Sequence, residues 1–292
     1  MENSELQIEV IPSEAALSLI TKAEIDMQIS TAKAFPRSIK MFMDKALSIA
    51  TVSDSVAASC SYALPRGGKA LEGPSVRLAE IVCSSYGNIR SGARVISNDG
   101  KTITAQGVCH DLETNNSVTV EVKRSILDKY GKPFKEDMQV VTGNAACAIA
   151  YRNAVFKVIP SALISDIYDK TKEVARGTAE TLPQRRDKAV KYFKDQGITE
   201  QQICDILQIK RIEDIDLDKL QTLRGMVTLI KNGESTLQEL FEKANTTIDD
   251  VKELFEAKKA KLTEEELTNA NRIIDNKEAN SYSKLYKLLQ SK

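Results

Sequence analysis

The sequence has a single histidine, His110, and no tryptophan. A Ser-His-Asp or Cys-His catalytic system would have to use that one imidazole, and a histidine-rich metal site is excluded. His110 follows Cys109 in a segment with the alternation of a strand, where neighbouring side chains point to opposite faces and cannot share a proton. We therefore expect His110 to be structural or exposed.

Cysteines are few and dispersed, and long apolar runs are missing. The five cysteines are odd in number and form no CxxC pair, so we expect reduced thiols in a cytoplasmic protein. The N-terminal segment MENSELQIEV has no apolar core and does not resemble a signal peptide. No run of about 18 apolar residues is present to cross a membrane.

Neither sign of charge dominates the chain. Lys plus Arg and Asp plus Glu each number 41, so net charge does not point to nucleic acid or to a membrane. The basic part is the middle, where residues 60–176 hold 16 basic and 12 acidic residues. The glycine-rich segment GGKALEGPS lacks the GxxxxGK[ST] spacing of a phosphate-binding loop. We expect no cofactor, no metal and no enzymatic activity.

Residues 88–126 change to the two-residue period of strands. Apolar residues such as Ile103, Ala105 and Val120 alternate with polar ones, and Asn98-Asp99-Gly100-Lys101 is a strong hairpin turn. A long helix is predicted over 137–158. We therefore expect an α+β fold in which a three-stranded antiparallel meander packs on this long helix.

The reverse face of that helix is nearly all small: Gly143, Ala146, Ala150 and Ala154. Such a face allows a second close packing partner. We expect this helix face and the edges of the meander to contact neighbouring copies of the chain.

The remaining patterns predict helices and loops around this core. Helices are expected over 13–34 with Ser13 as cap, over 37–50, from Ser53 or Asp54 to near Tyr62, and from the cap Ser75 to Tyr86, where Gly87 stops the helix. Further along the chain, Thr199 is expected to cap one helix and Asp216 or Asp218 to start the next. Residues 63–75, with three glycines and two prolines, predict a loop. The predicted organisation is N-terminal helices plus a core over 1–176, a polar linker over 177–186, and an all-helical, partner-binding region over 187–292.

Basic residues gather in the predicted sheet and in the loops beside it, where Tyr130 and Phe134 alternate with lysines. Cations that meet phosphates and rings that accept bases are typical of a groove for single-stranded DNA. A solvated charged face is the alternative interpretation. The candidate DNA-binding residues are Arg66, Lys69, Arg90, Arg94, Lys123, Arg124, Lys129, Tyr130, Lys132, Lys135, Arg152 and Lys157.

Arg152 differs from the other candidates because it falls within the apolar stripe of the long helix. A buried guanidinium is costly unless it has an acceptor. Two interpretations follow: an ion pair within the chain, or a phosphate contact at the edge of a groove between the long helix and the sheet.

The order of these elements resembles the core of single-strand annealing proteins. ALEGPSVRLAEIVCSSYG, followed by the meander and QGVCHDL, resembles the eukaryotic Rad-fifty-two annealing family, and RNAVFKVIP resembles the end of the matching helix in phage RecT, Redβ and Erf-like proteins. The segment from GITEQQICDIL to STLQELF is similar to a helical module of phage recombination proteins.

The resemblance implies ATP-independent annealing of complementary strands in homologous recombination, in the cytoplasm of a bacterial host. It also implies assembly into a ring or filament, and docking of a host single-strand-binding protein or a phage exonuclease on the C-terminal region. Arg152 falls where the family places cations on the long helix, and Lys157 follows in the same segment. A protein-binding adaptor is the alternative from another class, and a metal-dependent nuclease is a third.

Overall fold

The computed structural model describes residues 14–66, 69–128, 131–241, 248–259, 262–275, 285 and 288–289. The helices are α1 Glu14–Ala34, α2 Ile39–Ala50, α3 Asp54–Ser59, α4 Val76–Tyr86, α5 Glu136–Val158, α6 Ser161–Arg176, η1 Ala179–Thr181, α7 Leu182–Asp195, α8 Glu200–Leu207, η2 Ile212–Asp214, α9 Leu217–Lys231, α10 Leu237–Phe241, α11 Ile248–Lys258 and α12 Glu264–Asp275. The strands are β1 Ser61–Arg66, β2 Lys69–Pro74, β3 Ile89–Asn98, β4 Thr102–Asp111 and β5 Asn116–Ser125. The fold is α+β, as expected.

The predicted meander is confirmed: β3, β4 and β5 form one antiparallel sheet in that order. Asp99 closes the β3–β4 turn, where its carboxylate accepts hydrogen bonds from the backbone amides of Lys101 and Thr102. These bonds lower the pKa of the exposed Asp99 carboxyl to about 2. Gly100 takes a positive φ of 80° in this turn, which its missing side chain permits.

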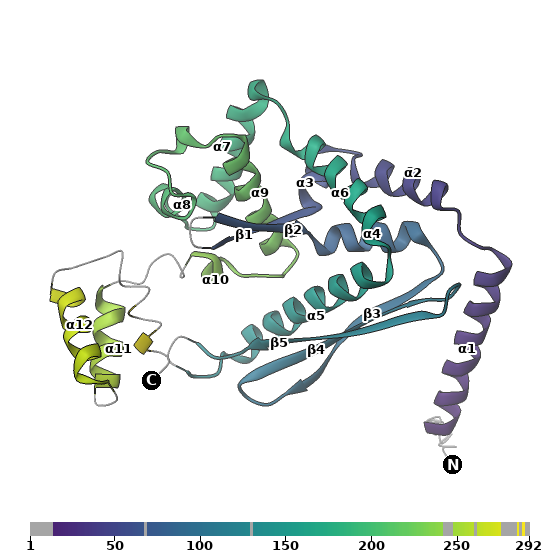
Figure 1. Cartoon of the computed structure of the whole chain (residues 1–292), viewed down its shortest axis with the longest axis horizontal. Coiled ribbons are helices and arrows are strands. Elements are labelled where there is room, and N and C mark those ends of the chain that lie inside the picture. Colours follow the sequence, from purple (N-terminus) through teal and green to yellow (C-terminus); the bar gives the residue numbers. More distant parts are fainter. Residues whose placement is uncertain are drawn as a thin grey trace, which may run out of the picture.

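Helix α5 lies across one face of the meander (Figure 1). The sequence predicted that the small residues of this helix contact another copy of the chain. That prediction is wrong, because β4 of the same chain covers them. Ala146 and Ala150 are fully buried against Ala105 of β4. A Cβ placed on Gly107 would be 2.2 Å from the backbone oxygen of Ala150, so the strand and the helix meet backbone to backbone. The predicted groove between the long helix and the sheet is therefore wrong along β4.

Helices α2, α4 and α6 extend this core on the side of the sheet where α5 lies (Figure 1). Ser75 caps α4 by accepting a hydrogen bond from the Leu78 amide, and Gly87 ends the helix at a φ of 70°, both as predicted. Phe42 of α2 meets the Tyr86 ring edge to face at 5.0 Å. These residues and Val155 of α5 belong to one buried cluster.

The joint between α1 and α2 is fixed by Arg37. Its guanidinium donates hydrogen bonds to the carboxylates of Asp111, at the end of β4, and of Glu113, in the turn that follows, and stacks 3.9 Å from the centre of the Tyr86 ring. Burial alone would raise the pKa of both carboxyls. The hydrogen bonds from Arg37, together with one from Asn88 to Glu113, outweigh this effect and hold both pKa values below their ordinary values.

Residues 63–66 and 69–74 lie in strands and not in a loop, which corrects the sequence-based prediction. They form most of the hairpin β1–β2, in which Ala63 pairs with Glu72 and Pro65 with Ala70. The two prolines fit because a two-stranded ribbon leaves edges where a missing amide hydrogen costs nothing. The hairpin is held by α9: a Cβ on Gly225 would lie 2.6 Å from the Ala63 Cβ.

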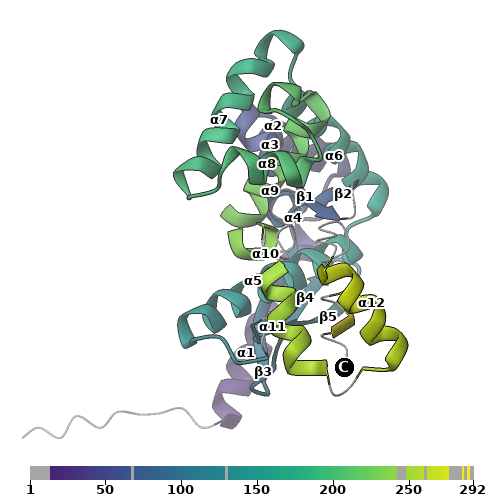
Figure 2. The same ribbon diagram turned by 90° about the vertical axis from the view of Figure 1, so that its left-hand side faces the viewer.

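Helices α7 to α10 lie together beside the β1–β2 hairpin (Figure 2). They enclose a second buried cluster, which includes Phe193, Leu223 and Phe241, and Tyr62 and Leu64 of β1 pack against it. The predicted start of α8 at Thr199 is confirmed by a capping hydrogen bond, and of the two candidates for the start of α9, Asp216 and Asp218, the structure has Asp216 as the cap.

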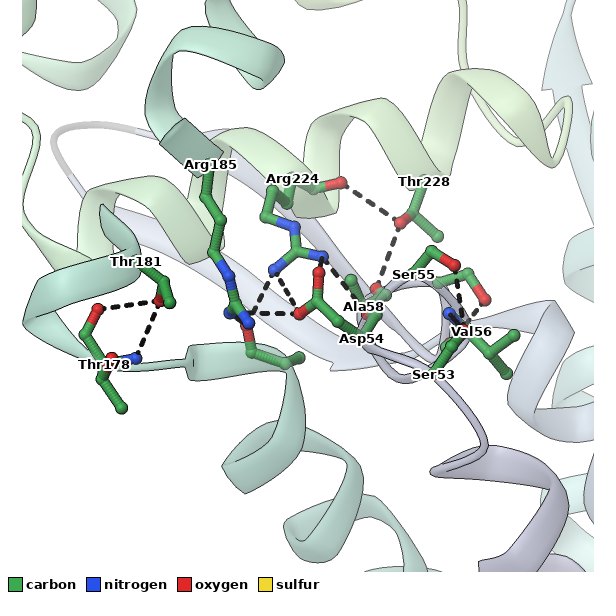
Figure 3. A network of polar contacts seen from close by, with 12 residues as sticks. Ser53, Asp54, Ser55, Val56, Ala58, Thr178, Thr181, Arg185, Arg224 and Thr228 are labelled. Atoms are coloured by element: carbon green, nitrogen blue, oxygen red, sulfur yellow. Dashed lines mark hydrogen bonds and ion pairs between the residues drawn. The ribbon is translucent and has the colours of Figure 1, made fainter. Parts of the chain in front are cut away.

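Residues 177–186, predicted to be a linker, hold η1 and the beginning of α7. Arg185 of this segment and Arg224 of α9 both pair with Asp54 at the start of α3 (Figure 3). Thr228 of α9 also donates a hydrogen bond to the Ala58 carbonyl. The division of the chain near 177–186 remains a prediction, but helices on its two sides share a packed, ion-paired contact.

Helices α11 and α12 form a separate pair around Val251, Phe255 and Ile273. Ser13, the expected cap of the first helix, lies outside the described residues. Within the described ranges, no single helix is long and apolar enough to cross a bilayer; α5 and α6 meet that test only as a pair, bent by 119°.

Candidate nucleic-acid interface

The register of the meander sorts its side chains onto two faces. Ala105, Gly107 and Cys109 face α5, so their neighbours in β4 point to the opposite side. Strand pairing sets Arg94 beside Gln106 and Arg90 beside His110 on that second face. We call this second side the open face. Lys123 also lies on it, paired with Thr104.

The open face carries three cations and little acid. Arg94 and Lys123 are exposed and Arg90 is half-buried. Among the described residues of β3, β4 and β5, the register places one carboxylate on this face, that of Glu121 opposite Gln106. The sequence-predicted residues Arg90, Arg94 and Lys123 are therefore brought together on one surface.

Hydrogen bonds hold these cations only weakly. Arg94 Nη2 reaches Gln106 Oε1 at 3.4 Å, and Arg90 Nη1 reaches Gln28 Oε1 of α1 at 3.5 Å. Both acceptors are neutral amides, so neither guanidinium charge is cancelled by them. A hollow of about 520 Å³ flanks Arg90 and is lined by Met27 and Thr31 of α1 and by Ile89 of β3.

A second group of cations lies at the end of the sheet where β3 turns into β4. The Ile126 amide donates to the Lys101 carbonyl at 2.9 Å, which joins the segment after β5 to this turn. Lys132 and Lys135 follow that segment and are exposed. Lys101 is an exposed cation of the same end that the sequence reasoning missed, although it belongs to the recognised turn. Lys129 and Tyr130 lie outside the described residues.

Arg124 and Arg152 are paired inside the chain. Arg124 Nη2 lies 2.6 Å from Glu239 Oε1, and Arg152 Nη1 lies 2.5 Å from Glu234 Oε2. The ion pair that we weighed for Arg152 is therefore the observed arrangement. Arg124 points to the α5 side of β5, so it does not share the open face with its neighbour Lys123.

The other candidates are apart from the open face. Arg66 and Lys69 pair with each other at the described end of the β1–β2 hairpin. Lys157 is exposed in the last turn of α5. At 1.5 Å per residue it is about 33 Å along the helix from Lys135, so these two cations belong to different ends of the molecule.

The groups that could serve covalent or metal chemistry are not assembled. His110 Nε2 lies 3.0 Å from Asn115 Oδ1, and Cys109 is on the opposite face, as predicted. Burial raises the pKa of the Cys109 thiol to about 12, which keeps it protonated. In the part of the chain that the structure describes, no three His, Cys, Asp or Glu residues are grouped to hold a metal ion.

The combined surface is a polar sheet face with loosely held cations and a basic rim at one end. It can attract a polyanion. No protein-family model, curated protein or solved structure matches the chain.

Proposed function

We propose that this protein binds single-stranded DNA on the open face of its meander and anneals complementary strands without ATP, as in phage recombination. The observation that carries the proposal is that Arg90, Arg94 and Lys123 lie together on the sheet face that α5 leaves uncovered. These cations contact the phosphates of the DNA strand. The polar side chains beside the cations, such as Gln106 and Thr119, leave space for that strand.

The chemistry of annealing needs no catalytic group. A strand held by its phosphates keeps its base edges free, so a complementary strand can pair with it, and base stacking supplies the driving force. The sequence resemblance to annealing proteins adds the expectation that this takes place in the cytoplasm of a bacterial host.

Several copies must act together, because one open face offers few phosphate contacts. Weak contacts on linked copies add up to tight binding. The outer strand β3 supports this, since Val95 and Ile96 are 46% and 41% exposed on it, and Val140 of α5 is 59% exposed. An apolar edge strand of this kind favours self-association. A single-strand-binding protein or an exonuclease is the partner class proposed for the C-terminal helices.

An annealing assay tests the proposal. Two complementary fluorescent oligonucleotides are mixed with the purified protein, without nucleotide, over a range of salt concentrations. The variant R90Q/R94Q/K123Q should lose most of the acceleration, and its single-strand affinity should depend less on salt, with a log–log slope lower by about 2, at about 0.7 per phosphate contact.

The matched control is K170Q/K191Q/K194Q, which removes three exposed cations of α6 and α7. It should anneal like the wild type. Equal loss in both variants would show that net charge alone matters and would refute the open face as the site. Binding of a protein partner that persists at about 0.5 M salt, with no annealing, would favour the adaptor instead.

A further inference from the structure

The segment between α9 and α10 inserts a carboxylate into the core of the protein. Gly233 takes a φ of 68°, and the next residue, Glu234, is only 3% exposed. Glu234 Oε2 is 2.5 Å from Arg152 Nη1, and its Oε1 accepts a hydrogen bond from the Val76 amide at the first turn of α4, at 3.4 Å. Elements far apart in the chain thus meet at one carboxylate.

Arg124 holds the same segment from the other side. Its Nη1 donates to the Glu234 carbonyl at 2.9 Å, and its Nη2 donates to Glu239 Oε1 at 2.6 Å. The Tyr62 ring lies under the Arg152 guanidinium, 4.7 Å from its carbon. Two guanidiniums, a helix amide and an aromatic ring are the groups that bind a nucleotide, since cations take the phosphate and a ring stacks on the base.

Stability alone does not account for this buried pair. Burial of the Glu234 carboxyl is costly enough to raise its pKa, even with Arg152 beside it. Well-packed apolar side chains in place of a buried ion pair are often equally stabilising or more so. The carboxylate therefore fills a position suited to an anion without being the most stabilising choice there.

The position lies next to the open face. Lys123 and Arg124 are consecutive residues of β5, and their side chains point to opposite sides of this outer strand. A strand of DNA that leaves Lys123 and crosses the edge of β5 arrives at Arg124. The half-exposed Glu239 lies at that entrance.

We propose that Glu234 stands in for a DNA phosphate. Residues 232–239, the Glu234 segment, close a second phosphate site made by Arg124, Arg152 and the Val76 amide, and a phosphate of bound single-stranded DNA displaces the carboxylate. This inference rests on the proposed function. The apparent affinity for DNA equals the affinity of the open form multiplied by the fraction of molecules that are open. The segment therefore regulates how tightly the protein holds DNA.

Charge removal tests the proposal. E234Q should bind a fluorescent oligo(dT) several-fold tighter than the wild type, with a salt slope steeper by about 0.7 to 1.4, for one or two added phosphate contacts. E200Q removes the same charge from an exposed pair with Lys194 and should change neither quantity. R152M/E234M removes both partners and should not bind tighter. A folded E234Q with wild-type affinity and slope would overturn the proposal.

Hydrogen exchange on the wild-type protein decides the matter if E234Q does not fold. The amides of Glu234 and Ser235 both donate to the Leu229 carbonyl, at 2.9 and 3.2 Å, and are released when the segment opens. Their exchange should become faster when oligo(dT) is bound. Unchanged or slower exchange with DNA bound refutes the displacement and leaves the open face intact, whereas a wild type that binds no oligo(dT) at low salt refutes both proposals.

Discussion

Two strand glycines offer a matched test of which face of the meander is covered. An added Cβ at Gly107 would lie 2.2 Å from the Ala150 oxygen, 2.3 Å from the Ala150 carbonyl carbon and 2.8 Å from the Tyr151 nitrogen. All three are backbone atoms, so no side chain can turn away. An added Cβ at Gly92, on the open face, meets no atom within 4 Å among those described.

The expected difference between G107A and G92A follows from these contacts. Both substitutions restrict the unfolded chain to a similar degree, a gain of about 0.4–1 kcal/mol, so this term cancels in the comparison. What remains is the overpacking of α5 on β4, about 1–3 kcal/mol of lost stability for G107A. Urea denaturation followed by circular dichroism should give a lower midpoint for G107A and a wild-type midpoint for G92A.

The same pair separates packing from binding. G92A should keep annealing activity, because a methyl group on the open face adds little beside the cations. Equal midpoints for the two variants would refute the close contact between α5 and β4. The assignment of Arg90, Arg94 and Lys123 to an uncovered face would then fail with it, since it depends on that contact.

Two further predictions concern the contacts that hold the helices. G225A should lower the denaturation midpoint, because its Cβ would press on Ala63 of β1; wild-type stability would show that α9 is not seated on the hairpin. R37M should be less stable at neutral pH. The pKa values of Asp111 and Glu113 are lowered by Arg37, so the stability they add is present above about pH 4 and is lost as the pH falls through their lowered values. The stability gap between R37M and the wild type should therefore narrow as the pH falls, and a gap that stays constant through the acid range would contradict the pairing.

The sequence allowed the local parts of the fold to be predicted. The meander could be predicted because its alternation and its Asn98–Lys101 turn are encoded by adjacent residues. The helix caps at Ser75 and Thr199 could be predicted for the same reason. The β1–β2 hairpin was missed because prolines and glycines dominate its composition. What makes it a hairpin is tertiary: the close approach of Gly225 to Ala63 fixes β1 against a helix that begins about 150 positions later.

The candidate site was only partly accessible for the same reason. Strand alternation placed Arg90, Arg94 and Lys123 together, and the structure has them on one face. For Arg152 the sequence showed that an acceptor was required. Its partner Glu234 is 82 positions away, in a segment that no local pattern connects to the long helix.

Lysine footprinting on the wild-type protein tests the central claim most directly. The protein is acetylated with a small reagent, with and without oligo(dT) at low salt, and the modified positions are read by mass spectrometry. Lys123 of the open face and Lys101 at its basic end should be protected by the oligonucleotide, while the exposed Lys170 and Lys191 should react equally in both samples. Bound oligonucleotide with Lys123 still fully reactive would contradict the account.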